Sequence, residues 1–219
     1  MLEAARTTKG LPIRIPKEGM VMIPHSDRSR RSLELHTVSE WSESLWARIC
    51  PVYEASFPEH IRKPERIVRN MMTKMDAFLH EGTLDAATCS MALTGLSADS
   101  RLLIIDYLAV LPAFRGRGAG RETVRAIADW AVRTYGVQGL LIEAEADDSE
   151  IGRGRTRFWQ SCGFEATEYV HSYIWVPEKY RAMLLDLQPE STPADRKLPR
   201  DGRRLFDDIE AFHKASFAR

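Results

Sequence analysis

The strongest candidate for chemistry is a glycine-rich stretch in the middle of the chain. It reads Val-Leu-Pro-Ala-Phe-Arg-Gly-Arg-Gly-Ala-Gly from Val110 to Gly120, after an apolar run (102–110) and before a helical pattern (121–135). The first backbone N–H groups of a helix have no partner within the helix, and the helix dipole favours negative charge there. Glycine lets an anion approach the backbone without a Cβ in the way. The stretch therefore predicts a pyrophosphate site.

Spacing narrows the choice of ligand. A dinucleotide-binding turn reads G-x-G-x-x-G, and here Gly116 and Gly118 fit but Arg121 stands at the last position. The phosphate loop G-x-x-x-x-G-K-[ST] does not occur. What remains is Arg115-x-x-Gly118-x-Gly120, preceded by Leu-Ala-Val-x-Pro, or else an ordinary glycine-rich turn from a strand to a helix.

Composition sets the broad class of the protein. The chain has 219 residues, enough for one domain with a substantial core, and a net charge of zero, which argues against general binding to nucleic acid or membrane surfaces. It has no apolar run near the roughly 20 residues of a membrane span and no secretory signal is evident. The three scattered cysteines are typical of free thiols in a reducing compartment, so we expect a cytoplasmic protein without a disulfide framework or a metal site.

Hydrophobic periodicity predicts the elements that position the turn. Residues 33–187 are expected to form one domain in the order β–α–α–β–β–β–α–β–α–β–β. Ser39 is expected to cap the first helix, Pro51 to kink or divide it, and residues 147–155 to form a polar loop before a helix over 156–162. Residues 1–32 are expected to form an N-terminal arm, and 188–219 a linker and an amphipathic helix with Leu205, Ile209, Phe212 and Phe217 on its apolar face.

The turn and the order of elements together resemble the GNAT family (Gcn5-related N-acetyltransferases), whose coenzyme A loop reads [QR]-x-x-G-x-[GA]. The resemblance covers about residues 33–187. It implies an α/β (α+β) fold, with a mixed, mostly antiparallel central sheet of about seven strands that is flanked by helices and splayed between the fourth and fifth strands. It also implies an acyl-CoA-dependent N-acetyltransferase, which moves an acetyl group from acetyl-CoA to a primary amine by direct attack in a ternary complex. No metal is expected.

The resemblance also implies which residues hold coenzyme A. Backbone groups of Leu108, Ala109 and Val110 are expected to bind the pantetheine arm as an added strand would. The pyrophosphate is expected to lie on the backbone N–H groups of the loop, with charge-assisted contacts from its arginines. The loop residues are Arg115, Gly116, Arg117, Gly118, Ala119, Gly120 and Arg121.

Two carboxylates compete for the role of base, because the acceptor amine has to lose a proton before it attacks. Glu143 lies on the apolar strand beyond the splay and resembles the base of the family members that acetylate peptide N-termini. Burial on such a strand is expected to raise its pKa. Asp106 lies four residues before Val110, so strand alternation predicts that it shares a face with Leu108 and Val110. A structural carboxylate bonded to the backbone is the alternative for each.

The usual acid of the family is missing. Its members read N-x-x-A-x-x-x-Y-x-x-x-G-F, and the tyrosine protonates the leaving thiolate. Gly163 and Phe164 fit this pattern, but Trp159 stands at the tyrosine position. An indole N–H donates a hydrogen bond yet delivers no proton near neutral pH. We expect Trp159 to border coenzyme A, while Tyr107, Tyr173, Cys162 or water acts as the acid or the thiolate leaves unprotonated.

The acceptor side is expected near the loop between the first two helices. This loop, Phe-Pro-Glu-His-Ile-Arg-Lys-Pro over 57–64, resembles that of a subset of the family and makes Glu59 and Arg62 candidates, with Tyr107 beside them. The partner is expected to be a small-molecule or peptide amine, without nucleic acid or membrane, and the protein a monomer or homodimer.

Two other functions stay open. Without the usual tyrosine, the chain fits a degenerate family member that binds acyl-CoA as a sensor or regulator. A phosphate- or nucleic-acid-binding module built on the Arg-Gly-Arg-Gly segment is a more remote alternative, which the neutral charge disfavours.

Overall fold

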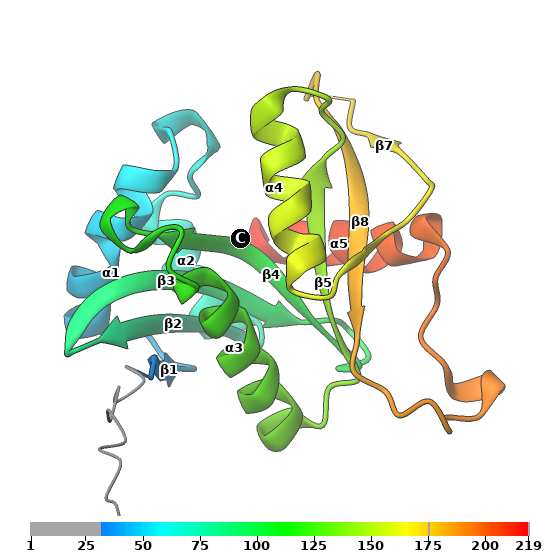
Figure 1. Cartoon of the computed structure of the whole chain (residues 1–219), viewed down its shortest axis with the longest axis horizontal. Helices are drawn as coiled ribbons and strands as arrows, with labels where there is room; N and C mark the ends of the chain where they lie inside the picture. The colour runs from blue at the N-terminus through cyan, green and yellow to red at the C-terminus, as the bar shows by residue number, and fades with distance from the viewer. Residues whose placement is uncertain (1–31, 175, 219) are drawn as a thin grey trace, which may run out of the picture. The chain divides into compact units, whose positions relative to one another are not determined.

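The computed structural model describes residues 32–174 and 176–218 (Figure 1). The predicted N-terminal arm, apart from Ser32, lies outside these residues. Within the described part, no helix combines the length and apolar character needed to cross a membrane.

The core of the fold is one eight-stranded sheet in the order β1-β2-β3-β4-β5-β8-β6, with β7 also paired to β8. Every neighbouring pair is antiparallel except β4 and β5, which are parallel. This confirms the predicted mixed, mostly antiparallel sheet; about seven strands were expected, and the short β6 is the additional one. The strands are β1 Glu34–Val38, β2 Ala77–Leu84, β3 Ala87–Leu96, β4 Leu102–Val110, β5 Gly139–Glu145, β6 Glu165–Ala166, β7 His171–Ser172 and β8 Lys179–Asp186.

Helices cover both faces of the sheet. Buried side chains of α1, α2 and α5 form one apolar cluster with one face, and those of α3 join the cluster on the other face, against which α4 packs. In Figure 1, α4 lies in front of β5, while α5 crosses behind β8 and β5. The helices are α1 Glu43–Ser56, α2 Glu65–Lys74, α3 Ala119–Tyr135, α4 Glu150–Ser161 and α5 Gly202–Ser216, with short 3-10 turns η1 Glu59–Ile61, η2 Pro112–Phe114 and η3 Ala194–Arg196.

Two predicted helix starts are wrong, and both for reasons of capping. The side chain of Ser42, not Ser39, accepts from the Leu45 backbone N–H and starts α1, which then continues through Pro51. Helix α4 starts at Glu150 within the predicted loop, because the Ser149 hydroxyl accepts from Gly152 N at 3.0 Å. Such a cap contributes about 1 kcal/mol and offsets much of the cost of a helical glycine.

The central parallel strands part after a short contact. Pairing between β4 and β5 runs only from Leu102 and Gly139 to Ile104 and Leu141. Beyond it, β4 stays paired to β3 as far as Val110, and β5 stays paired to β8 as far as Glu145. The predicted splay between the fourth and fifth strands is therefore confirmed.

A β-bulge in β4 changes which side chains face which layer. Leu93 pairs with Tyr107 and Thr94 with Ile105, so Asp106 is the extra residue. A bulge shifts the alternation by one: Asp106 reaches Lys63 and Tyr107 packs on α1, both on the face of α1 and α2. Leu108 packs with the α3 cluster on the other face. The prediction that Asp106 shares a face with Leu108 and Val110 is wrong for this reason.

Candidate active site

The glycine-rich loop forms an anion cradle at the start of α3. Gly116 and Gly118 have φ values of 72° and 91°, in the left-handed region that favours glycine. Gly118 is the N-cap of α3, and no side chain caps the helix there. The first-turn N–H groups therefore keep their capacity to bind an anion. An added Cβ would have nothing within 4 Å at Gly116, and at Gly118 only Glu122 Oε1 at 3.9 Å, so the residues present fit a pyrophosphate.

The arginines of the loop have different surroundings. Arg115 Nε donates to the Val110 carbonyl at 2.8 Å, so this side chain holds the loop against the end of β4. Arg117 and Arg121 are exposed, where they are available to an anion.

Phe158 on α4 closes the loop from the other side, and sequence reasoning missed it. A Cβ on Gly120 would lie 3.0 Å from Phe158 Cε2 and 3.4 Å from Val110 Cγ2. Glycine at 120 thus permits close packing of α3 on α4 and β4. The signal in the sequence was only an aromatic residue next to Trp159.

Trp159 belongs to the same aromatic cluster. Its ring lies 5.0 Å from that of Phe158 and 5.1 Å from that of Phe164, both edge-on. It is partly buried against the core on the face of α3 and α4, the face that also carries the loop. The network around Glu143 draws on the opposite face.

The predicted pantetheine contacts lie where β4 has left β5. Leu108, Ala109 and Val110 pair with β3 on one side, while pairing with β5 has ended at Ile104. Backbone groups on the β5 side therefore need other partners, and an extended ligand with amide groups would be a suitable one.

A buried ion pair lies behind β4, and sequence reasoning missed its lysine. Lys63 Nζ lies 2.8 and 2.7 Å from the two oxygens of Asp106, and the two side chains are 6% and 5% exposed. Because both carboxylate oxygens are occupied by an ammonium group, accepting a proton at Asp106 would break the pair. This arrangement favours a structural role for Asp106.

Tyr107 fastens the loop that carries Lys63. Its hydroxyl donates to the Ile61 carbonyl at 2.7 Å and accepts from the Lys63 backbone N–H at 3.2 Å. Burial, with the charge of Asp106 and the neighbouring Tyr53, raises the pKa of Tyr107 well above its usual range. Tyr107 is thus a poor proton donor to a leaving thiolate.

Glu143 is held by two side chains from distant parts of the chain. His213 Nε2 on α5 lies 2.9 Å from its Oε1, and the Tyr173 hydroxyl donates to its Oε2 at 2.8 Å. Burial alone would raise the pKa of Glu143, but hydrogen bonds from His213 and Tyr173 and the charges of His213 and Lys63 outweigh it, and the pKa is lowered. The expected raised pKa is therefore wrong.

Tyr173 remains a hydroxyl donor in this network. Burial and the charge of Glu143 raise its pKa well above the usual range. Tyr180 on β8 lies beside it, with ring centroids 5.6 Å apart, and burial with the Glu143 charge raises the pKa of Tyr180 to about 12. Both phenols therefore stay protonated at neutral pH.

The other predicted acceptor-side residues lie apart from Glu143. Glu59 is exposed in η1, and Arg62 Nη1 pairs with Glu54 on α1 at 3.1 Å. Sequence reasoning missed His213 as a partner of Glu143. His213 follows Phe212 and comes four residues after Ile209, so it borders the apolar face of α5.

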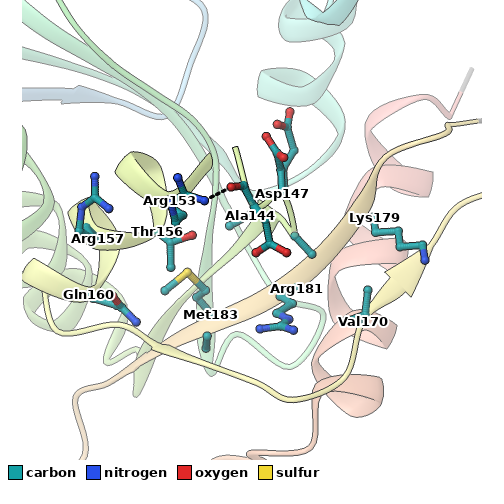
Figure 2. A pocket seen from close by; sticks show the side chains of 14 residues that line it. Ala144, Asp147, Arg153, Thr156, Arg157, Gln160, Val170, Lys179, Arg181 and Met183 are labelled. Carbon is teal, nitrogen blue, oxygen red and sulfur yellow. Dashed lines mark hydrogen bonds between the residues drawn. The ribbon is translucent and has the colours of Figure 1, made fainter. Parts of the chain in front are cut away.

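The structure also has a cavity of about 470 Å³ lined by α4 and by strands β5 and β8 (Figure 2). Thr156 and Gln160 of α4, Ala144 of β5, and Arg181 and Met183 of β8 line it, with charged side chains of both signs around them. None of the predicted coenzyme A residues lines this cavity, and in Figure 2 Arg157 and Lys179 lie at its opposite ends. The cavity is therefore separate from the loop and from the predicted pantetheine contacts. Among the described residues, no group of three His, Cys, Asp or Glu side chains is placed to hold a metal ion.

Gly118→Ala is expected to weaken coenzyme A binding at least about tenfold, or 1.4 kcal/mol, because a Cβ at positive φ distorts the cradle. Gly136→Ala is the matched control. Gly136 ends the same helix with φ 67°, also with open space around it. Each variant is expected to lose about 1–2 kcal/mol of stability, but only Gly118→Ala should change the affinity measured by calorimetry. Equal affinities would reject the loop as the binding site.

The Lys63–Asp106 pair is expected to show strong coupling in a double-mutant cycle measured by denaturant unfolding. Lys63→Met or Asp106→Asn alone leaves a buried charge without its partner and should cost about 3–5 kcal/mol, while the double variant costs much less than the sum. The exposed pair Arg69–Glu65 is the control, with coupling of about 0.3–0.5 kcal/mol. Coupling at Lys63–Asp106 no larger than in the control would contradict the buried pair.

Glu143→Gln is expected to change the pH dependence of stability. A carboxyl whose pKa is lowered in the folded state stabilises the protein above its unfolded pKa, near the ordinary value of 4.5. This contribution disappears as the pH falls through the folded pKa. The stability difference between wild type and variant should therefore be largest above that value and shrink in acid, as followed by thermal unfolding. A constant difference would show that Glu143 is not held as an anion.

Known structures share this fold. A GNAT-family protein of Bacteroides thetaiotaomicron superposes with a TM-score of 0.59 at 15% identity, over 83% of this chain and 94% of that chain. The ribosomal-protein-S18-alanine N-acetyltransferase of Escherichia coli gives 0.52 at 18%, over 73% and 99%. YncA of Salmonella typhimurium, solved with acetyl-CoA, gives 0.52 at 15%, over 74% and 98%.

Sequence comparison identifies the family. No curated protein sequence shows significant similarity to this chain. The model of the acetyltransferase (GNAT) family matches residues 47–164, more than half of the chain and the part that holds the loop, the parted strands and Glu143. The chain therefore belongs to the GNAT family of acetyltransferases.

Proposed function

We propose that this protein transfers an acetyl group from acetyl-CoA to a primary amine by direct attack in a ternary complex. The observation that carries the proposal is that β4 and β5 separate, and that each of the two strands carries a different group of candidate residues. The glycine-rich loop lies at the end of β4 on one side, and the network of Glu143, His213 and Tyr173 lies on β5 on the other. A family member solved with acetyl-CoA, and another named for the acetylation of an alanine, have this fold.

The chain's own residues have distinct tasks in this proposal. N–H groups at the start of α3 hold the pyrophosphate, with Arg117 and Arg121 near it. Backbone groups of Leu108–Val110 orient the pantetheine arm and the thioester. The network that Glu143 forms with His213 and Tyr173 receives the proton of the acceptor amine. Asp106 holds Lys63 and the loop that follows α1. The three cysteines are unpaired thiols, which fits the cytoplasm.

A second candidate function is binding of acyl-CoA without turnover. The observation that favours it is Trp159, which packs against Phe158 and Phe164 where other family members have a tyrosine acid. The two functions differ in whether an amine triggers release of free thiol.

Release of coenzyme A thiol from acetyl-CoA across a panel of small amines and peptides tests the proposal. We expect release that depends on at least one amine and follows saturation kinetics. Glu143→Gln should lower the rate near neutral pH by about 100-fold, the size of a general-base effect, with little change in coenzyme A affinity. Glu145→Gln is the control, because Glu145 lies on the same strand and pairs with Arg155 at the surface.

Two outcomes would change the assignment. Tight coenzyme A binding without amine-dependent release anywhere in the panel would establish the binding protein instead. The second outcome concerns the double variant Lys63→Met/Asp106→Asn. If this variant folds but is inactive while Glu143→Gln keeps its activity, the proton acceptor is Asp106.

A further inference from the structure

His213 comes from a part of the chain beyond the matched family region, yet it contacts the central residue of the site. The family match ends at residue 164, whereas α5 spans Gly202–Ser216. His213 Nε2 lies 2.9 Å from Glu143 Oε1, and the two side chains are 26% and 25% exposed. The contact is therefore partly shielded but open to a small reactant.

The position of His213 is set by the burial of α5. Leu205, Ile209 and Phe212 are 0%, 0% and 3% exposed and belong to the same core cluster as α1 and α2. Asp201 caps the helix by accepting from Arg203 N at 3.0 Å. A helix packed along its length cannot rotate without exposing these side chains, so the His213 backbone is fixed relative to β5.

The residue that follows α5, four positions after His213, reaches the groups behind β4. Phe217 follows the helix, and Lys63 Nζ lies 5.6 Å from its ring centroid. The C-terminal end of α5 thus reaches groups on both parted strands. His213 contacts Glu143 on β5, and Phe217 lies against Lys63, which pairs with Asp106 on β4.

Hydrogen bonding assigns different roles to Glu143 and His213. Each oxygen of Glu143 has a donor, His213 Nε2 or the Tyr173 hydroxyl. A carboxylate that receives a hydrogen bond on each oxygen is a weak base, whereas imidazole ordinarily titrates between about pH 5 and 8. With its Nε2–H on the carboxylate, His213 has Nδ1 as the acceptor, and this atom has no hydrogen-bond partner among the described residues. A carboxylate that orients an imidazole in one tautomer is a recurrent arrangement in acyl transfer.

We propose that His213 is the catalytic base of the acyl transfer and that Glu143 is its positioning residue; this proposal rests on the proposed function. As the amine nitrogen bonds to the acyl carbon, its proton passes to Nδ1. The C–S bond breaks with its electron pair on sulfur, and the imidazolium returns the proton to the thiolate through solvent. Protons and electrons balance without an acid at position 159.

The charged and titratable groups around His213 come from several elements. They are Glu143 on β5, Tyr173 after β7, Tyr180 on β8, Lys63 with Asp106 near Phe217, and Glu210 on α5, which pairs with His171. A change in the charge of any of these groups would also shift the pH–rate profile. The test therefore compares the profile of each variant with that of the wild type under the same conditions.

The test measures amine-dependent thiol release by the full chain, with His213→Gln as the variant and Lys214→Gln as the control. Glutamine keeps a donor for Glu143 but takes no proton, and Lys214 is the exposed next residue. We expect kcat of His213→Gln to fall about 100-fold or more, with unchanged coenzyme A affinity and melting temperature. The limb of the pH–rate profile that belongs to the base should disappear. Lys214→Gln should behave as wild type.

A second variant keeps the proposal testable if His213→Gln is unstable. Glu143→Gln retains a partner for the imidazole but removes its negative charge, so the acid limb of the kcat profile should move to lower pH. Free imidazole should restore part of the activity of His213→Ala. An unmoved limb together with no rescue would overturn the role of His213.

The outcomes separate this proposal from the proposed function. Wild-type turnover with full activity and an unchanged pH profile in His213→Gln would reject His213 as the base and leave the acetyltransferase intact. Higher activity in His213→Gln would show that α5 obstructs the acceptor and would also reject it. A wild-type protein that binds coenzyme A and never releases thiol with any amine would end both proposals.

Discussion

Beyond Ile104 and Leu141 the two central strands no longer hydrogen-bond to each other, and both halves of the site depend on this parting. Each strand keeps its outer neighbour, β3 for β4 and β8 for β5, so the sheet stays intact while its middle is divided. Unpaired backbone groups on β4 suit an extended amide ligand. The bulge at Asp106 occurs where β4 leaves β5, and bulges increase local twist.

The two faces of the divided sheet carry different chemistry. The glycine-rich loop, Phe158 and Trp159 lie with α3 and α4, which suits binding of a long anionic ligand. Lys63, Asp106, Glu143 and His213 lie with α1, α2 and α5, where buried charges are paired and hydrogen-bonded. In the proposed reaction the acyl group passes between the strands from the first face to meet the amine on the second.

Helix α5 makes the second face complete. It fills the side of the sheet next to α2 with Leu205, Ile209 and Phe212 and brings a titratable group to β5. The same contacts stabilise the fold and orient His213, so in the proposed mechanism proton transfer depends on the packing of α5. Proton handling centred on His213, rather than on a tyrosine of α4, is consistent with a tryptophan at position 159.

Local residue patterns were enough to predict the loop, the order of the main elements and the family. Glycine spacing, apolar periodicity and the helix pattern are local, and the backbone conformations that they require follow from the residues themselves. The face on which each β4 side chain lies and the partners of Glu143, in contrast, depend on contacts between distant segments of the chain. A bulge depends on the register between strands, and one added residue moved Asp106 to the opposite face from Leu108. The lowered pKa of Glu143 depends on a histidine 70 positions away. Burial on an apolar strand predicted a raised pKa for Glu143. The sequence indicates that the residue is buried, but not which charges and hydrogen-bond donors the fold places beside its carboxylate.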